Sequence, residues 1–311
     1  MHYRQLGRSG LTVSVVGLGC NNFGGRLDLE ASRPVIHAAL DAGVTLFDTS
    51  NTYGNRGGSE TILGEVLRGR RDEVVLATKF GSDMGEGPGV ARGSRRYIRQ
   101  AVEGSLTRLQ TDRIDLYQLH RPDPLTPLEE TLAALDELVR EGKVLYIGSS
   151  NLAAWQVAHA EWVAATAHLE RFVSAQNHLS LLETAATAEL LPSCRHYGVG
   201  VLPFFPLANG LLTGKYRRSQ SAPEGTRLSG REITDTTYDR IEALEEFARQ
   251  RDHTLLELAV GALAAMQPVA SVIAGATTPG QVEANVAAAD WELTGDDLAA
   301  LDDLLGLPAE A

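Results

Sequence analysis

Four side chains that can hold or transfer a proton stand at or just after the ends of short apolar runs. Asp48, Lys79 and His120 each follow such a run directly, and Tyr53 lies five residues after Asp48. A lysine ammonium beside a tyrosine stabilises the phenolate and moves the tyrosine pKa from about 10 toward neutrality. A buried lysine needs a counter-ion, which Asp48 would supply. A histidine would orient a carbonyl oxygen or relay its proton.

This set of groups suits the donation of a proton to a carbonyl oxygen. Proton donation is half of a carbonyl reduction, since the hydride must come from a cofactor. Each residue alone also has an ordinary explanation, as a loop cap, a surface aromatic, a solvated lysine or a core histidine. Because four residue types needed for proton transfer occur at successive strand ends, the chemical interpretation is favoured over four separate structural ones.

Eight short runs rich in Val, Ile and Leu recur along the chain, and helical patterns fill most of the intervals. The runs are 15–18, 45–47, 74–78, 114–119, 144–148, 172–175, 200–204 and 271–274. Continuous apolar runs are typical of parallel strands that are covered on both faces. The repeat of about 30 residues is the length of one strand–helix unit. Both a closed (β/α)8 barrel and an open doubly wound sheet satisfy this pattern.

The positions of the polar residues favour the barrel. The fifth and sixth runs also end in polar residues, at 150–151 and 176–177. In a barrel the carboxyl ends of all strands share one rim, where active sites lie, whereas an open sheet would spread them along an edge. The sequence therefore predicts an α/β protein with a (β/α)8 TIM barrel, and an enzyme. No linker divides the chain, so we expect a single domain over residues 1–311.

Helix starts are marked by side chains that can accept a hydrogen bond from a backbone N–H group. They occur at Ser94, Thr126, Thr254 and Thr278. Thr126 is followed by Pro127 and Glu129, which predicts a capping box with proline at the first helical position. Thr254 and Thr278 show the same spacing to an acid or amide three residues later.

Three segments depart from the strand–helix repeat. Residues 2–13 predict a short hairpin of strands 3–6 and 12–15 that turns at residues 7–10. The glycine-rich stretch 81–93 predicts a mobile loop. Residues 209–237 predict a long loop, followed by an extra helix over 238–250, and insertions of this length in a barrel are typical of lids or binding loops.

The composition excludes several classes of protein. The net charge is −12, which argues against a nucleic-acid-binding surface. No apolar run reaches the roughly 18 residues of a membrane span, and the first residues carry no apolar signal core. Cys20 and Cys194 are the only cysteines, and the histidines show no ligand spacing, so neither a disulfide framework nor a metal is expected. We expect a cytoplasmic protein that holds any anionic ligand with local cations and backbone amides.

Several segments resemble the signatures of the aldo-keto reductases, in order along almost the whole chain. They are residues 47–54 (FDTSNTYG), 78–79 (TK), 115–122 (DLYQLHRP), 147–151 (IGSSN), 206–207 (PL), 210–215 (GLLTGK) and 281–285 (QVEAN). The chain is more similar to the bacterial reductases and potassium-channel beta subunits of this family than to its mammalian aldose-reductase branch.

The resemblance implies a role for each matching residue. Tyr53 would be the general acid, supported by Asp48, Lys79 and His120. The expected cofactor is NADPH, bound by Cys20, Asn21, Ser150, Asn151, Gln176, Phe204, Pro206, Leu207, Gly210, Lys215, Arg227, Gly275, Thr277, Gln281 and Asn285. Among these, Ser150, Asn151 and Gln176 would hold the nicotinamide amide and Phe204 would stack on the ring. The loop 206–215 would wrap the pyrophosphate, and Arg227 would reach the adenosine phosphate. The residues around the adenosine end would be Gly275, Thr277, Gln281 and Asn285.

The chain departs from the family pattern at several cofactor positions. Phe204 stands where tyrosine or tryptophan is usual, Phe205 replaces a serine, and Ala284 replaces a glutamate. Asn21 stands where tryptophan is frequent, which would make that wall of the substrate site smaller and more polar. The rest of the substrate site is expected to be shaped by Phe23, Phe80, Arg121 and the loops 81–93 and 209–237.

The resemblance implies an NADPH-dependent reductase that transfers a hydride to the carbonyl of an aldehyde or ketone. The alternative is a nucleotide-sensing binding module like the channel beta subunits, with little turnover. Under the reductase hypothesis, the partner is a small carbonyl compound. Neither hypothesis involves nucleic acid or a membrane.

Overall fold

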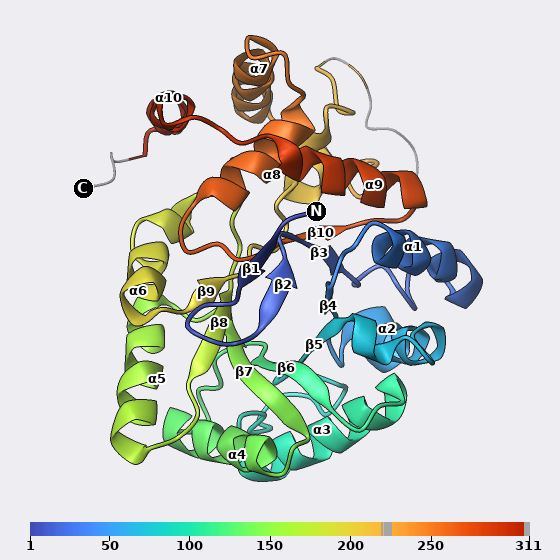
Figure 1. Ribbon diagram of the computed structural model, residues 1–311, viewed down its shortest axis with the longest axis vertical. Helices are drawn as coiled ribbons and strands as arrows, with labels where there is room; N and C mark the ends of the chain where they lie inside the picture. The colour runs from blue at the N-terminus through green and yellow to red at the C-terminus, as the bar shows by residue number, and fades with distance from the viewer. Residues whose placement is uncertain (219, 221–225, 308–311) are drawn as a thin grey trace.

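Eight parallel strands curl into a barrel at the centre of the computed structural model, which describes residues 1–218, 220 and 226–307 (Figure 1). The strands are β3 (Val16–Gly19), β4 (Leu46–Asp48), β5 (Val75–Phe80), β6 (Ile114–Leu119), β7 (Val144–Ser150), β8 (Phe172–Gln176), β9 (Gly200–Val201) and β10 (Val272–Gly275). Their order in the sheet is β10-β3-β4-β5-β6-β7-β8-β9. All eight predicted runs thus form strands in one sheet, as expected.

Backbone hydrogen bonds close the sheet between its two end strands. Val201 donates its N–H to the carbonyl of Pro268, and Ala270 donates to the carbonyl of Val201, both at 2.9 Å. Farther along, Ile273 donates to the carbonyl of Pro203 at 3.1 Å. The closed barrel is therefore confirmed and the open doubly wound sheet is wrong. β9 is shorter than the predicted run 200–204 because Pro203 has no N–H with which to continue the ladder.

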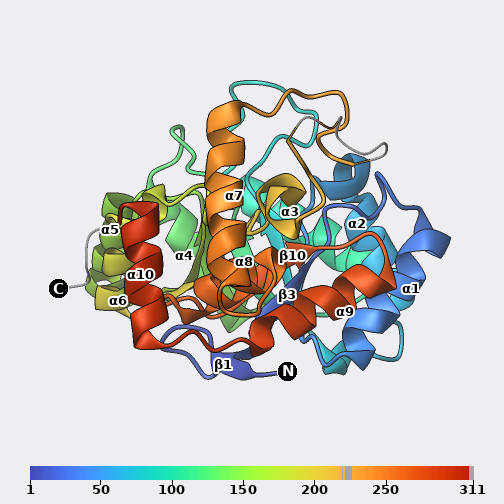
Figure 2. The same cartoon turned by 90° about the horizontal axis from the view of Figure 1, so that it is seen from above.

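Helices cover the outside of the barrel. The helices of the repeat are α1 (Leu29–Asp41), α2 (Tyr53–Val66), α3 (Arg95–Leu109), α4 (Leu128–Arg140), α5 (Ala154–Ala167), α6 (Leu190–Tyr197), α8 (Leu255–Ala265) and α9 (Pro279–Ala287). Two further helices, α7 (Asp235–Arg249) and α10 (Gly295–Leu305), lie outside the repeat (Figure 2). Short 3-10 turns are η1 (Arg71–Glu73), η2 (Ala185–Thr187), η3 (Ala208–Thr213) and η4 (Ala288–Asp290). None of the described helices is both long and apolar enough to cross a bilayer.

The predicted N-terminal hairpin covers one end of the barrel. It consists of β1 (Tyr3–Gln5) and β2 (Thr12–Ser14), paired antiparallel. Leu6 and Val13 are fully buried and pack against inward-facing side chains of the barrel strands, including Leu46 and Leu116. Full burial of a leucine side chain contributes about 1.5–3 kcal/mol to stability. This burial holds the hairpin against one end of the barrel as its floor. In Figure 2 the hairpin lies at the bottom and the long loops lie at the opposite end.

Most predicted helix starts are confirmed, and one is wrong. The Ser94 side chain accepts from the N–H of Tyr97, and Thr254 forms a complete capping box with Glu257. Thr126 does not cap α4. Its hydroxyl donates to Asp123 at 2.7 Å, and Pro127 is the N-cap without a side-chain hydrogen bond. The Asp123 carboxylate also accepts from the N–H of Leu125, so it forms a local turn that competes with the capping box.

The other departures from the repeat follow the sequence in part. Thr278 caps α9, but the side chain of Gln281 accepts from Thr277 instead of completing a box. α7 begins at Asp235, three residues before the predicted start, because the Thr234 side chain caps it. The predicted loop 209–237 begins within η3, and its residues 219 and 221–225 lie outside the described residues. The segment 81–93 forms neither helix nor strand, and its mobility stays a prediction.

Candidate active site

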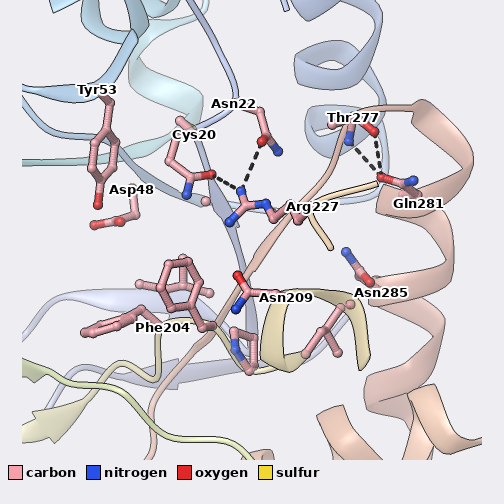
Figure 3. Close-up of a pocket in the computed structure, with 18 of the residues that line it drawn as sticks. Cys20, Asn22, Asp48, Tyr53, Phe204, Asn209, Arg227, Thr277, Gln281 and Asn285 are labelled. Atoms are coloured by element: carbon pink, nitrogen blue, oxygen red, sulfur yellow. Dashed lines mark hydrogen bonds between the residues drawn. The ribbon is translucent and has the colours of Figure 1, made fainter. Parts of the chain in front are cut away.

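A cavity of about 530 Å³ lies at the carboxyl ends of the barrel strands, opposite the hairpin floor (Figure 3). Its lining includes Asp48, Tyr53 and His120, and Lys79 lies directly behind them. It also includes every residue predicted to bind the cofactor, namely Cys20, Asn21, Ser150, Asn151, Gln176, Phe204, Pro206, Leu207, Gly210, Lys215, Arg227, Gly275, Thr277, Gln281 and Asn285. The structure therefore brings these residues together, and their roles stay predictions.

Lys79 and Asp48 form a buried ion pair at the base of this cavity. The Lys79 Nζ donates to Asp48 Oδ2 at 2.7 Å and to the carbonyl of Thr49 at 2.8 Å. Lys79 is fully buried and Asp48 is 3% exposed. The other carboxylate oxygen, Oδ1, accepts from Gln176 Nε2 at 2.8 Å and from Gln118 Nε2 at 3.2 Å. Each charge is thus paired and hydrogen-bonded, which a buried ion pair requires.

The register of three adjacent strands places this pair. In the ladder, Asp48 of β4 is opposite Ala77 of β5, and Lys79 of β5 is opposite Gln118 of β6. Since side chains alternate between the two faces of a strand, Lys79 faces the barrel interior and its neighbour Phe80 faces outward. Burial disfavours the ammonium form, but the Asp48 carboxylate, with a smaller effect from Tyr53, outweighs burial and raises the pKa of Lys79. Lys79 therefore carries a positive charge at neutral pH.

Tyr53 lies next to this cation at the start of α2. Its hydroxyl is 3.5 Å from the Lys79 Nζ, which is 4.9 Å from the centre of the tyrosine ring. Left-handed backbone at Gly54, with φ +65°, turns the chain directly after it. Burial raises the pKa of Tyr53, and the opposing effect of Lys79 does not overcome it. The expected net shift of the Tyr53 pKa toward neutrality is thus wrong, because desolvation of the phenolate dominates. Tyr53 keeps its proton at neutral pH, as a proton donor must.

His120 is the second polar group beside Tyr53. The two rings meet edge to face at 5.9 Å, and the His120 Nδ1 lies 3.1 Å from Ser50 Oγ. Asn151 holds the His120 backbone, since its Nδ2 donates to the His120 carbonyl at 3.0 Å. Burial, with smaller contributions from Lys79 and Arg121, lowers the pKa of His120 to about 3. A neutral imidazole can orient a carbonyl oxygen by donating a hydrogen bond from a ring N–H. The low pKa therefore favours this role for His120 over a proton relay, in which its ring would become charged.

The loop after β9 has left-handed backbone at three residues other than glycine. Phe205, Ala208 and Asn209 have φ values of +53°, +45° and +59°. Left-handed backbone at residues other than glycine is strained and clusters at functional sites. The Lys215 ammonium lies close to this backbone, because a Cβ on Gly210 would come within 2.8 Å of its Nζ. Among the described residues, Lys215 has no carboxylate partner.

Arg227 lies in the middle of the cavity. Its guanidinium donates to Asn21 Oδ1 at 2.9 Å and to Asn22 Oδ1 at 3.0 Å, and in Figure 3 it lies between Asn22 and Gln281. Burial, with a smaller effect of Arg26, lowers the pKa of Arg227. At the end formed by α9, Thr277 donates its N–H to Gln281 Oε1 at 2.8 Å. The amides of Asn21 and Asn22 therefore hold Arg227 beside the segment that follows β3.

The cavity is locally cationic although the chain carries a net charge of −12. Its lining includes Arg26, Arg121, Lys215 and Arg227, and Asp48 is the one carboxylate among the described residues that line it. Lys79 neutralises that carboxylate. The positive charges, the strained loop and the start of α9 are the features that bind phosphate groups. The residues present therefore fit a phosphate-bearing dinucleotide.

The prediction that Phe23 and Phe80 shape the substrate site is wrong, and one residue of the site was not predicted. Phe23 and Phe80 are fully buried in the main hydrophobic core and do not line the cavity. For Phe80 the reason is strand alternation, which turns it away from the face of Lys79. Gln118 was not predicted, although it donates to Asp48. The signal that could have found it was its place near the end of β6, two residues before His120. Among the described residues, no group of His, Cys, Asp and Glu side chains could hold a metal ion.

The chain is similar to one protein family and to several named proteins along almost its whole length. The model of the aldo/keto reductase family matches residues 15–305. An uncharacterized oxidoreductase of Bacillus subtilis, YrpG, is 38% identical over 99% of this chain and 97% of its own length. A probable voltage-gated potassium channel subunit beta of Oryza sativa is 36% identical over 93% of this chain and 92% of its own length. An L-glyceraldehyde 3-phosphate reductase of Escherichia coli K12 is 34% identical over 93% of this chain and 87% of its own length.

The first prediction concerns the charge of His120. With a pKa of about 3 in the folded protein and about 6.5 in the unfolded chain, its ring should show no titration between pH 5 and 8. The unfolded chain binds the proton more readily, so the contribution of His120 to stability is fully present above pH 6.5 and is lost as the pH falls toward 3. Histidine-ring NMR and urea unfolding at pH 5 and pH 7 measure the two effects.

The matched variant is His120→Asn, which assigns the resonance and removes the titrating group. It should lose less stability than the wild type between pH 7 and pH 5. A His120 ring that titrates near pH 6.5 would contradict the buried, neutral assignment.

Proposed function

The chain belongs to the aldo/keto reductase family, and we propose that it reduces the carbonyl of an aldehyde or ketone to an alcohol with NADPH. The observation that carries this proposal is the contact of Tyr53 with the charged Lys79, which Asp48 holds in the barrel. When bound, NADPH supplies the hydride that the carbonyl carbon receives. The oxidoreductase and reductase names among the relatives support this activity.

The side chains of the site donate the proton and orient the substrate. Tyr53 gives its proton to the substrate oxygen, and the adjacent ammonium of Lys79 stabilises the phenolate that this transfer leaves behind. His120, as a neutral imidazole, hydrogen-bonds the same oxygen and orients it. Because these groups lie in a largely buried site, their electrostatic effects are stronger than in water.

The residues proposed to hold the cofactor follow the length of the cavity. Ser150, Asn151 and Gln176 would bind the nicotinamide amide. The Nε2 of Gln176 already donates to Asp48, which leaves its amide oxygen as an acceptor. Phe204 would pack on the nicotinamide ring, Lys215 and the loop around Gly210 would bind the pyrophosphate, and the start of α9 would bind the adenosine end.

The second candidate is a nucleotide-sensing binding module. The Oryza relative, whose name is that of a channel subunit, favours it. Both candidates bind the nucleotide, so binding alone does not distinguish them. Turnover does, because only the reductase needs a proton donor at the carbonyl site.

The second prediction tests the reductase through Tyr53→Phe. The wild type should oxidise NADPH in the presence of 4-nitrobenzaldehyde, and the variant should lose about 10²–10⁴-fold in kcat, the usual contribution of general-acid catalysis. NADPH affinity should change little, because the lost hydroxyl serves the carbonyl. The control is Tyr3→Phe, in the hairpin, whose hydroxyl bonds only to the backbone of Gly43 among the described residues.

Two outcomes would contradict this assignment in different ways. A Tyr53→Phe enzyme with more than half the wild-type kcat would remove Tyr53 from the acid role. Tight NADPH binding by the wild type without turnover of any aldehyde or ketone would favour the binding module.

The third prediction concerns the choice of cofactor. Charge-assisted hydrogen bonds to phosphate contribute about 1.5–3 kcal/mol each, or roughly one to two powers of ten in affinity. If Arg227 binds the adenosine 2′-phosphate, Arg227→Ala should weaken NADPH binding at least tenfold more than NADH binding in calorimetric titrations. The control is Arg249→Ala, whose side chain is 72% exposed and pairs with Glu246 on α7. Equal weakening of both cofactors, or a wild-type preference for NADH, would refute the assignment.

A further inference from the structure

Arg121 is a cation at the catalytic end of the cavity that the proposed reaction does not use. It follows His120 directly at the end of β6 and lines the cavity. Among the described residues, it has no ion pair with a carboxylate. Its charge acts on the active site, since it contributes to the lowered pKa of His120.

The topology separates Arg121 from the residues proposed for the adenosine end. In the order β10-β3-β4-β5-β6-β7-β8-β9, β6 is four strands from β10 in either direction around the closed barrel. Thr277 and Gln281 follow β10, so they lie across the barrel mouth from Arg121. His120 directly follows β6, next to Arg121 in the chain, and Tyr53 follows β4, which is two strands from β6. In the proposed function, Lys215 and Arg227 bind the phosphates of the dinucleotide, and Arg121 has no role there.

An arginine that lines the same cavity as Tyr53, and that has no carboxylate partner among the described residues, suits a negative charge on the substrate. The Asp48 carboxylate is neutralised by Lys79, so no carboxylate in the described lining repels an anion here. The planar guanidinium binds carboxylate or phosphate through two parallel hydrogen bonds, which fixes orientation as well as position. Such an anchor would hold the far end of a small molecule while its carbonyl lies at Tyr53.

Building on the proposed function, we propose that the natural substrate is an anionic aldehyde or ketone whose carboxylate or phosphate binds Arg121. The anion lies away from the carbonyl, so Arg121 is a specificity-determining residue and takes no part in proton transfer. Its contribution should appear mainly in KM, because binding at a group remote from the reacting atoms is made in both the ground state and the transition state.

The experiment compares charged and neutral probes of nearly equal shape. 4-Carboxybenzaldehyde and 4-nitrobenzaldehyde differ chiefly in charge, and glycolaldehyde phosphate and glycolaldehyde provide the phosphate arm. The quantity measured is the ratio of kcat/KM for the charged probe to that for its neutral partner. Comparing this ratio between variants cancels the intrinsic reactivity of each carbonyl.

In Arg121→Gln, the ratio should fall about tenfold or more in at least one arm, which is the usual value of a charge-assisted hydrogen bond. Arg121→Lys should recover part of it, because the charge remains while the paired geometry is lost. The control is Arg68→Gln on the outside of the barrel, where the side chain is 68% exposed, and it should leave both ratios unchanged.

The outcomes separate this inference from the proposed function. A fall in the carboxylate arm alone or in the phosphate arm alone supports the inference and identifies the anion. Turnover of all four probes, with ratios that Arg121→Gln does not change, overturns the inference and leaves the reductase standing. Absence of turnover with every probe overturns both.

Discussion

The buried ion pair between Lys79 and Asp48 is the interaction on which the site depends. Removing two charges from water costs several kcal/mol per ion unless each is fully paired. Lys79 donates to Asp48 and to the Thr49 carbonyl, and Gln118 and Gln176 saturate the second carboxylate oxygen. These partners come from four strands, so the pair exists only in a closed barrel with the correct register. The hydrophobic core and the hairpin floor maintain that barrel, and the ion pair in turn fixes a cation beside the Tyr53 hydroxyl.

The rest of the cavity is locally positive in a chain that is negative overall. A chain with a net charge of −12 repels anions at long range, so anion binding has to come from short-range features. The cations of the lining, the left-handed backbone around Asn209 and the start of α9 provide such features from separate segments of the chain. Lys215 follows β9 and Arg121 follows β6, so these two cations would separate the proposed cofactor from the proposed anionic substrate.

Much of the fold and the site could be predicted from the sequence, because both follow from local patterns. Apolar runs marked the strands, and polar residues at their ends marked the rim. The predictions that failed concern contacts and burial, which depend on the folded structure. Thr126 was predicted to cap a helix, but Asp123 competes for its hydroxyl. The direction of the Tyr53 pKa depended on burial, which residue types alone do not reveal. Gln118 was missed because the role of a glutamine inside an apolar strand depends on its contact with Asp48, which lies on a strand two positions away in the sheet.

The most direct test of the account is the pH dependence of kcat in Lys79→Met. Loss of the cation that favours the phenolate should lower kcat and shift the basic limb of the profile to higher pH, because Tyr53 becomes a weaker acid. The single change also leaves Asp48 buried without its partner, at a cost of about 3–5 kcal/mol, so the double variant Asp48→Asn, Lys79→Met serves if the single variant does not fold. A normal kcat with an unchanged pH profile in either variant would show that Lys79 is only structural and would contradict the account.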